Sequence, residues 1–329
     1  MDRRRFLLTS LAGAVAAPLT AWAQAPARVT VLSPGTPVPH DDLAKAFVLG
    51  MHDHGFVDGQ DFVLDVRYVG TRADEVDRVV AELLPLRPSV IVTVGSHGAW
   101  AAKKATSTIP VVMAVVADPV GQGLVTSLAQ PGGNLTGNAI LSEAVSSKRL
   151  ELLHEALPKA RRIGVLENTS NPAYAFVRNG LDASAKQLGL SLVRFDAASP
   201  GAVETALEQI GRQRPDALLV AQDSLFYLTR AKIVQSVARQ RTPGIYPFRE
   251  AVTEGGLMSY ANSNQAMFRE AARFVARILR GAKPSDLPVE QARTFELVIN
   301  LGTAKALGLT IPPSLLARAD QVIESGASR

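Results

Sequence analysis

The chain has 329 residues, with 35 Lys and Arg against 30 Asp and Glu, 5 His and no Cys. The absence of Cys excludes disulfides, thiolate-bound zinc or iron–sulfur sites, a Cys nucleophile and a thiol for lipid attachment. A hydrophobic content of 47% with 20% charged residues is typical of a folded protein with a sizeable core, and the length favours two domains.

Residues 1–23 have the pattern of a signal peptide, and the adjacent arginines at 3–5 predict the twin-arginine type. An apolar run follows these arginines, and Ala21-Trp22-Ala23 offers a small-x-small cleavage site. The expected mature chain starts near Gln24 and carries no membrane anchor; an uncleaved anchor is the alternative, for which the apolar run is short. Because three Arg and one Asp are removed, the net charge falls from +5 to +3, so the basic composition does not predict a nucleic-acid partner.

From Arg28 onward, short β-branched runs alternate with longer segments that repeat apolar residues at helical spacing. The expected strands are Val29–Leu32, Phe62–Tyr68, Val90–Val94 and Pro110–Val116, and the expected helices are Asp41–His54, Ala73–Leu84 and Gly98–Thr106. Strands that alternate with helices predict a parallel sheet covered on both faces.

The same alternation restarts after the turn Pro131-Gly132-Gly133. The expected strands are Leu135–Gly137, Ile163–Leu166, Leu190–Phe195, Ala217–Ala221 and Gly244–Tyr246, and the expected helices are Ser142–Leu157, Pro172–Leu188, Ala202–Gln213 and Ser224–Arg239, with Ser142 as a cap. Two successive units of similar order predict an α/β protein with two lobes of one architecture, joined near Gly137.

The last third is expected to contain the strands Leu257–Tyr260 and Phe295–Ile299, the helix Ala266–Leu279, and short helical pieces at Thr303–Leu307 and Pro313–Glu324. If the chain crosses back near Ala261, the helix after it belongs to the first lobe. We therefore expect lobe 1 to contain residues 28–138 and 262–289, and lobe 2 residues 139–261 and 290–329. Several connections between the lobes would form a hinge.

Ligands of open parallel α/β sheets bind beyond the carboxyl ends of the strands, so the loops there supply the candidate site. The candidates are Ser33, Gly35, Gly95, Ser96, His97 and Asp118 from the first lobe, and Asn168, Ser170, Asn171, Asp223, Ser224 and Tyr246 from the second. Such residues also commonly cap helices, so the prediction depends on the set and not on any single member.

The composition of this set suits a zwitterionic amino acid. Helix-start N–H groups with Ser33, Ser96 and Ser170 suit an anionic end, and Asp118 or Asp223 suits an ammonium. Asp118, which precedes Pro119, is alternatively an N-cap. One or two aromatic residues would form a wall, and Tyr246 or Tyr260 is expected there; the other aromatic residues near these loops are Trp100, Tyr174, Phe226, Tyr227 and Phe248.

Enzyme and cofactor motifs are incomplete. Gly121-Gln122-Gly123 lacks the third glycine of a dinucleotide-binding loop, and no phosphate-cradling loop is present. His52 and His54 lack metal-ligand spacing on a helix, so neither a metal nor a cofactor is expected. Val94 stands where a hydrolase nucleophile elbow has Gly, which leaves Ser96 and His97 as the basis of an alternative, an exported hydrolase.

Several motifs together resemble a known family. They are Asp118-Pro119-Val120-Gly121-Gln122-Gly123, Pro131-Gly132-Gly133-Asn134-Leu135-Thr136-Gly137, Lys148-Arg149-Leu150-Glu151-Leu152-Leu153, Tyr246-Pro247-Phe248-Arg249-Glu250, Gly255-Gly256-Leu257-Met258-Ser259-Tyr260 and Phe295-Glu296-Leu297-Val298-Ile299-Asn300. In this order they resemble the periplasmic substrate-binding proteins of ABC transporters, the group that includes tryptophan- and tyrosine-binding members. The resemblance implies two Rossmann-like lobes joined by a hinge in a type I periplasmic binding protein architecture, a ligand closed between the lobes, and no catalysis.

The resemblance predicts a periplasmic component of an ABC importer that binds a small polar ligand, an amino acid or a related compound, and passes it to a membrane permease. The sequence departs from the family pattern at Ala117, at Ser96-His97-Gly98 and at Ala261, which leaves the ligand open. A ligand-presenting sensory partner is a further alternative. A transcription regulator of the same architecture would need an N-terminal helix-turn-helix, where this chain has the leader pattern.

Overall fold

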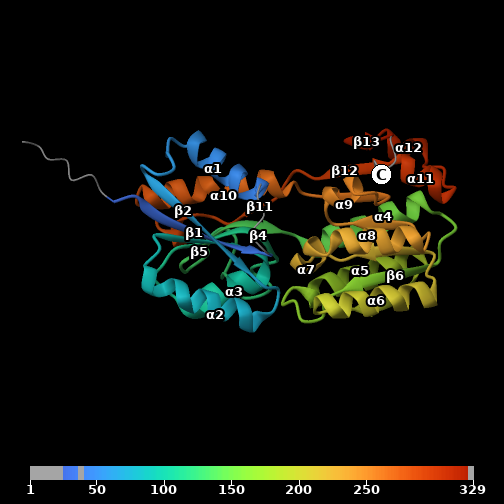
Figure 1. The fold of residues 1–329 in the computed structure, drawn as a ribbon, viewed down its shortest axis with the longest axis horizontal. Coiled ribbons are helices and arrows are strands. Elements are labelled where there is room, and N and C mark those ends of the chain that lie inside the picture. The colour runs from blue at the N-terminus through green and yellow to red at the C-terminus, as the bar shows by residue number, and fades with distance from the viewer. Residues whose placement is uncertain (1–24, 36–40, 325–329) are drawn as a thin grey trace, which may run out of the picture.

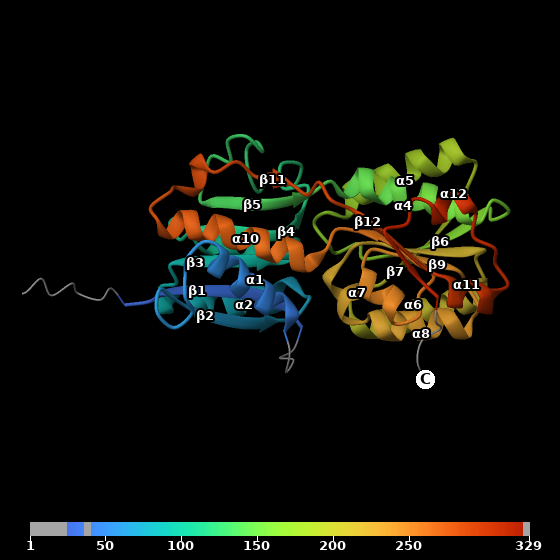
Figure 2. The ribbon, with the colours of Figure 1, turned by 90° about the horizontal axis from the view of Figure 1, so that it is seen from above.

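The computed structural model describes residues 25–35 and 41–324, so the predicted signal peptide lies outside the described residues. Figures 1 and 2 show two lobes side by side along the longest axis, each a sheet with helices on both faces. The α/β class, the two lobes and the mainly parallel sheets predicted from the sequence are confirmed.

The sheet of the first lobe is parallel throughout. Its strands, in spatial order, are β11 (Glu290–Gln291), β5 (Leu135–Ile140), β4 (Val111–Ala117), β3 (Val90–Val94), β1 (Ala27–Pro34) and β2 (Phe62–Val69). Its helices are α1 (Asp42–Asp53), α2 (Ala73–Leu83), α3 (Gly95–Ala105) and α10 (Asn264–Leu279), with short 3₁₀ turns at Leu84–Leu86 and Pro284–Asp286.

Alternation along the central strands divides the first core into two apolar layers. Val90 and Val92 of β3 pack with α1 and α10, whereas Ile91 packs with α2 and α3. Successive strand side chains point to opposite faces, so an uninterrupted apolar run buries both faces of the sheet. Figure 2 shows α10 lying along this sheet beside α1.

The sheet of the second lobe has one antiparallel pair, β10 with β12. Its strands, in spatial order, are β13 (Gln321–Ile323), β12 (Glu296–Asn300), β10 (Met258–Ala261), β9 (Gly244–Tyr246), β8 (Ala217–Val220), β6 (Arg162–Glu167) and β7 (Ser191–Asp196). Its helices are α4 (Ser142–Ala156), α5 (Tyr174–Leu188), α6 (Pro200–Gln213), α7 (Ser224–Leu228), α8 (Arg230–Arg239), α9 (Arg249–Thr253), α11 (Leu301–Leu307) and α12 (Pro313–Leu316).

Within the described ranges, the chain passes between the two sheets at three places: after β5, between β10 and α10, and between β11 and β12. The helix after Ala261 therefore packs on the first sheet, as its sequence position suggested. Residues 139–140 and 290–291 lie in the first sheet, at the edges of the ranges expected for the second lobe.

Three local predictions were wrong, each for a physical reason. The expected helix Ser224–Arg239 is interrupted at Thr229, whose hydroxyl donates to Leu225 O at 2.7 Å and competes with the helical hydrogen bonds. Residues 321–323 form strand β13 and do not extend the helix that starts at Pro313. There, Asp320 N pairs with Leu297 O at 2.9 Å and starts the strand.

The expected cap at Ser142 is also wrong. Leu141 is the N-cap residue of α4, and the Ser142 hydroxyl is buried without a hydrogen-bond partner among the described residues. The Ser142 N–H instead donates to Asp118 Oδ2 at 3.2 Å. Asp118 therefore accepts a hydrogen bond from the first residue of α4, which begins 24 residues later in the chain. It is not the N-cap of a helix that starts at Pro119.

Candidate functional site

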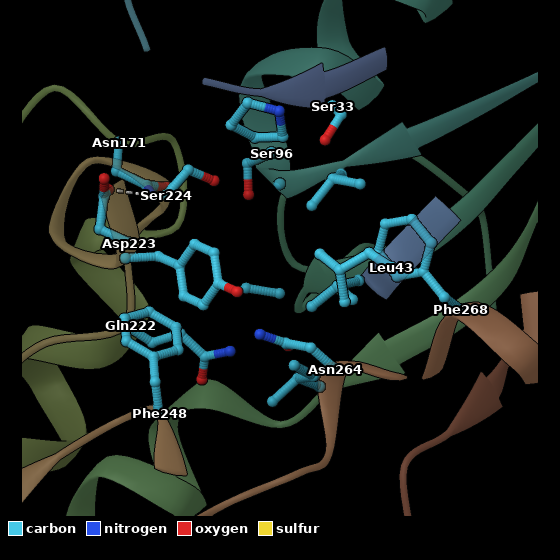
Figure 3. A pocket seen from close by; sticks show the side chains of 17 residues that line it. Ser33, Leu43, Ser96, Asn171, Gln222, Asp223, Ser224, Phe248, Asn264 and Phe268 are labelled. Carbon is cyan, nitrogen blue, oxygen red and sulfur yellow. Dashed lines mark hydrogen bonds between the residues drawn. The ribbon is translucent and has the colours of Figure 1, made fainter. Parts of the chain in front are cut away.

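A cavity of about 80 Å³ lies between the lobes, at the carboxyl ends of β1, β3, β4 and β8 (Figure 3). The polar residues that line it are Ser33, Ser96, Asn171, Gln222, Asp223, Ser224 and Asn264. The other lining residues are Pro34, Leu43, Val94, Gly95, Val115, Ala117, Ile140, Tyr227, Phe248 and Phe268.

Asp223 organises the polar part of the cavity from the second lobe. Its Oδ1 accepts from Leu225 N at 2.7 Å and caps α7, while its Oδ2 accepts from Asn171 Nδ2 at 2.6 Å and from Asn168 Nδ2 at 3.1 Å. The side chain is buried, and no Lys or Arg among the described residues forms an ion pair with it. Burial raises the pKa of Asp223, and the hydrogen bonds from Asn171 and Leu225 N oppose that rise.

The first lobe supplies serine hydroxyls at the ends of β1 and β3. Ser96, at the start of α3, is buried, and its Oγ accepts from Gln122 Nε2 at 2.9 Å. Gln122 also donates to Ala117 O, and its Oε1 accepts from Trp100 Nε1 at 3.2 Å. Gln122 therefore holds two lining residues of the cavity, Ser96 and Ala117, by hydrogen bonds.

The remaining wall is apolar and aromatic. Tyr227 and Phe248 from the second lobe meet edge to face, with ring centroids 5.0 Å apart. Leu43 and Phe268 enter from helices α1 and α10 of the first lobe, as Figure 3 shows. Such a surface favours a ligand with an apolar or aromatic body.

The structure brings six of the predicted residues to the cavity: Ser33, Gly95, Ser96, Asn171, Asp223 and Ser224. Two observations favour glycine at position 95. Its φ is +75°, and a Cβ there would lie 2.9 Å from Ser224 Oγ of the other lobe. Asn168 lies directly behind them, bonded to Asp223. Ser170 Oγ donates to Asn168 Oδ1 at 2.6 Å, so it supports this network and does not line the cavity.

The other predicted residues lie elsewhere. Gly35 packs against Leu228, and His97 lines two other pockets, one with Trp100 and one with Ser96 and Asp223. Tyr246 is buried in the core of the second lobe, where burial raises its pKa. Tyr260 stacks on Phe295 with centroids 5.4 Å apart. The aromatic wall is therefore supplied by Tyr227, Phe248 and Phe268.

The lining residues that the sequence did not predict include Leu43, Gln222, Asn264 and Phe268. Gln222 immediately precedes Asp223 at the end of β8, a position that the strand-end rule covers. Asn264 and Phe268 are four residues apart in α10 and share one helix face. Because α10 follows a crossing between lobes, its N-terminus reaches the cavity without following a strand of its own sheet.

Comparison with known proteins identifies the family. A model of the family described as ABC transporter substrate binding protein matches residues 36–323. The chain belongs to this family. Members are ligand-binding components of transporters, so the chain belongs to no enzyme family by this comparison.

Individual relatives agree with this assignment. A tyrosine-binding protein of Clostridioides difficile (strain R20291) is 29% identical over 271 residues, which cover 82% of this chain and 77% of the relative. The crystal structure of a conserved domain protein from Vibrio cholerae O1 biovar El Tor strain N16961 gives a TM-score of 0.84 at 29% identity, over 90% of this chain and 99% of that one. A Streptococcus pneumonia ABC domain in complex with L-Trp gives 0.81 at 27% identity, over 91% and 100%.

More distant solved binding proteins, 12% and 17% identical with TM-scores of 0.56 and 0.59, share the type I periplasmic binding protein fold. Ser96 and His97 of this ABC transporter substrate-binding protein line one small pocket together with Asp223, but no hydrogen bond in the described ranges joins their side chains. Their arrangement does not support the hydrolase alternative.

In residues 25–35 and 41–324, no group of three or more His, Cys, Asp or Glu side chains is placed to hold a metal ion. Over the same ranges, every helix is too short or too polar to cross a membrane.

Asp118 predicts a pH dependence of stability. Burial raises its pKa to about 6, with a smaller contribution from Glu143, while the Ser142 N–H opposes the rise. Between about pH 4 and pH 6 the folded state therefore binds more protons at Asp118 than the unfolded state, and stability falls as pH rises. Asp118→Asn keeps an acceptor for Ser142 N, so we expect it to be more stable than the parent at pH 7.5 and the gain to shrink toward pH 4.5, measured by urea unfolding.

Asp216→Asn is the control of opposite sign. Hydrogen bonds from Arg161 N and Arg162 N lower the pKa of Asp216, so its contribution is present at neutral pH and is lost in acid. A gain at Asp118→Asn that is the same at all pH values would contradict the role assigned to this carboxylate.

Proposed function

We propose that this protein captures an amino acid with an aromatic or large apolar side chain in the cavity between its lobes. In this proposal it is the periplasmic component of an ABC importer, and it passes the ligand to a membrane permease. The observation that carries the proposal is a buried carboxylate, Asp223, that forms no ion pair with a Lys or Arg of the described residues and lines the same cavity as an aromatic wall.

Asp223 is proposed to bind the ligand ammonium. Three donors occupy three of the acceptor positions of its carboxylate, which leaves capacity for one more hydrogen bond from the cavity side. An ammonium would also balance the buried negative charge, which none of the described Lys or Arg side chains does by an ion pair.

The wall of Tyr227, Phe248 and Phe268 is proposed to bind the ligand side chain. Removal of an aromatic ring from water is worth about 2–3 kcal/mol, so a ligand with such a ring gains more in this cavity than glycine or alanine does. The names of two relatives, a tyrosine-binding protein and a domain in complex with L-Trp, support this ligand class.

Ligand binding is proposed to favour the closed arrangement of the lobes. The cavity takes Ser33 and Ser96 from the first lobe and Asp223 and Phe248 from the second, so a ligand has all its contacts only when the lobes are together. This difference in contacts shifts the equilibrium between open and closed forms about the three crossings.

A thermal-shift screen with calorimetry tests the proposal. L-tryptophan, L-tyrosine and L-phenylalanine should raise the melting temperature of the mature protein, because they bind the folded state preferentially. Glycine and glucose serve as controls that lack the side chain or the charged groups. Equal shifts with glucose, or none with any aromatic amino acid, would show that the proposed ligand class is wrong.

Asp223→Asn should lower the affinity for these amino acids by about tenfold to 100-fold, since it removes the charge that faces the ammonium. Asp216→Asn is the matched control, because Asp216 and Asp223 flank opposite ends of β8 and both accept backbone N–H groups. Calorimetric titration should show nearly parental affinity for Asp216→Asn. Similar losses in both variants would assign the effect to general destabilisation of the second lobe.

Gly121→Ala should weaken binding by hindering closure. A Cβ at Gly121 in the first lobe would lie 2.7 Å from Phe176 Cε1 in the second, and no positive φ forbids alanine there. Crowding of this kind costs about 1–3 kcal/mol, so we expect about a tenfold loss of affinity with little change in unfolding of the free protein.

Two controls isolate that effect. Gly133→Ala places a Cβ where no atom lies within 4 Å and should bind like the parent. The double variant Gly121→Ala, Phe176→Ala should bind like Phe176→Ala alone, because the ring that collides with the new Cβ is gone. Persistence of the full loss in the double variant would refute the closure explanation.

A further inference from the structure

Arg149 is the largest fully buried side chain of the described residues, and it lies in α4 behind the cavity wall. Its Nε donates to Tyr260 O at 2.8 Å, and its NH2 donates to Gln222 Oε1 at 3.2 Å. Its NH1 is buried with no hydrogen-bond partner in the described ranges. Arg149 thus connects the end of β10, where the chain leaves the second lobe, with a residue that lines the cavity.

This guanidinium has no acidic partner within ion-pair distance among the described residues. Burial lowers its pKa to about 9, which still leaves it protonated at neutral pH. A buried charge without a counter-charge is costly, and an anion placed nearby from outside would reduce that cost.

Gln222 is the group through which this charge reaches the cavity. Arginine only donates hydrogen bonds, so the atom of Gln222 that meets Arg149 must be the carbonyl oxygen, and the amide nitrogen is directed away from it. Figure 3 shows that nitrogen pointing into the cavity, toward the amide of Asn264. Neither Gln222 Nε2 nor Asn264 Nδ2 donates a hydrogen bond to any of the described residues.

We propose that Arg149 makes the cavity selective for ligands that carry a carboxylate. It holds Gln222 so that Nε2 donates to the carboxylate, and its buried positive charge stabilises the anion through that polarised amide. Arg149 is a positioning residue in this arrangement, because Gln222 and Asn264 contact the ligand. The proposal rests on the proposed amino acid function, and it places the carboxylate next to Gln222 and the ammonium next to the adjacent Asp223.

The test compares L-tryptophan with tryptamine, which keeps the indole and the ammonium but lacks the carboxylate. Calorimetry on the mature parent protein should show tryptophan bound about tenfold to 100-fold more tightly than tryptamine. Arg149→Met and Gln222→Leu should each lower the affinity for tryptophan by about tenfold or more and leave that for tryptamine within about twofold. Arg149→Lys, which keeps the charge, should recover part of the preference.

Arg162→Met is the matched control, since Arg162 is a partly buried arginine of the same lobe that donates to Gln213, which does not line the cavity. It should keep the parental ratio of affinities. Gln222→Leu decides the question if Arg149→Met does not fold, because Gln222 lies at the cavity surface.

The outcomes separate the two proposals. A parent that binds neither tryptophan nor tyrosine overturns the amino acid function and this inference with it. A parent that binds tryptophan and tryptamine equally, or a preference for tryptophan that survives both Arg149→Met and Gln222→Leu, overturns the role of Arg149 alone.

Discussion

The carboxylate of Asp223 is the interaction on which the second lobe's side of the cavity depends. It accepts three hydrogen bonds at once, from the start of α7 and from the loop that follows β6. Two connections that are 55 residues apart are therefore held at one charged group. The hydrogen bonds from Asn168, Asn171 and Leu225 N offset part of the cost of burying this carboxylate.

The fold followed closely from the sequence because each strand is a short apolar run beside a helix of clear periodicity. Val90–Val94 and Val111–Ala117 are buried on both faces, so their pattern leaves little choice of element. The failures occurred where local hydrogen bonding decides. The Thr229 hydroxyl donates to Leu225 O in the preceding helical turn, and Asp118 accepts from Ser142 N, which is 24 residues away. Neither contact changes the spacing of apolar residues in the sequence, so neither could be predicted from that spacing.

The site was only partly predictable for a related reason. The strand-end rule found Ser33, Ser96 and Asp223, because parallel strands deliver their carboxyl ends to one edge. It does not say which aromatic residues near that edge turn inward. Tyr246 ends a strand and is core, whereas Phe268 lies in the second turn of a helix whose place depends on the crossing after β10. Arg149 belongs to the family motif that starts at Lys148, but its burial behind Gln222 depends on contacts between residues far apart in the sequence.

The placement of α10 has a consequence for the order of folding. Phe268 and Phe274 complete the same apolar layer as Phe47 and Val92, although more than 170 residues separate them along the chain. During synthesis, one face of the first sheet therefore stays open to water until the second lobe's main strands have already emerged. Contacts of such long range carry a large loop-closure cost and slow folding. The first lobe is thus not an autonomous N-terminal folding unit, because its core is complete only after α10 has been synthesised.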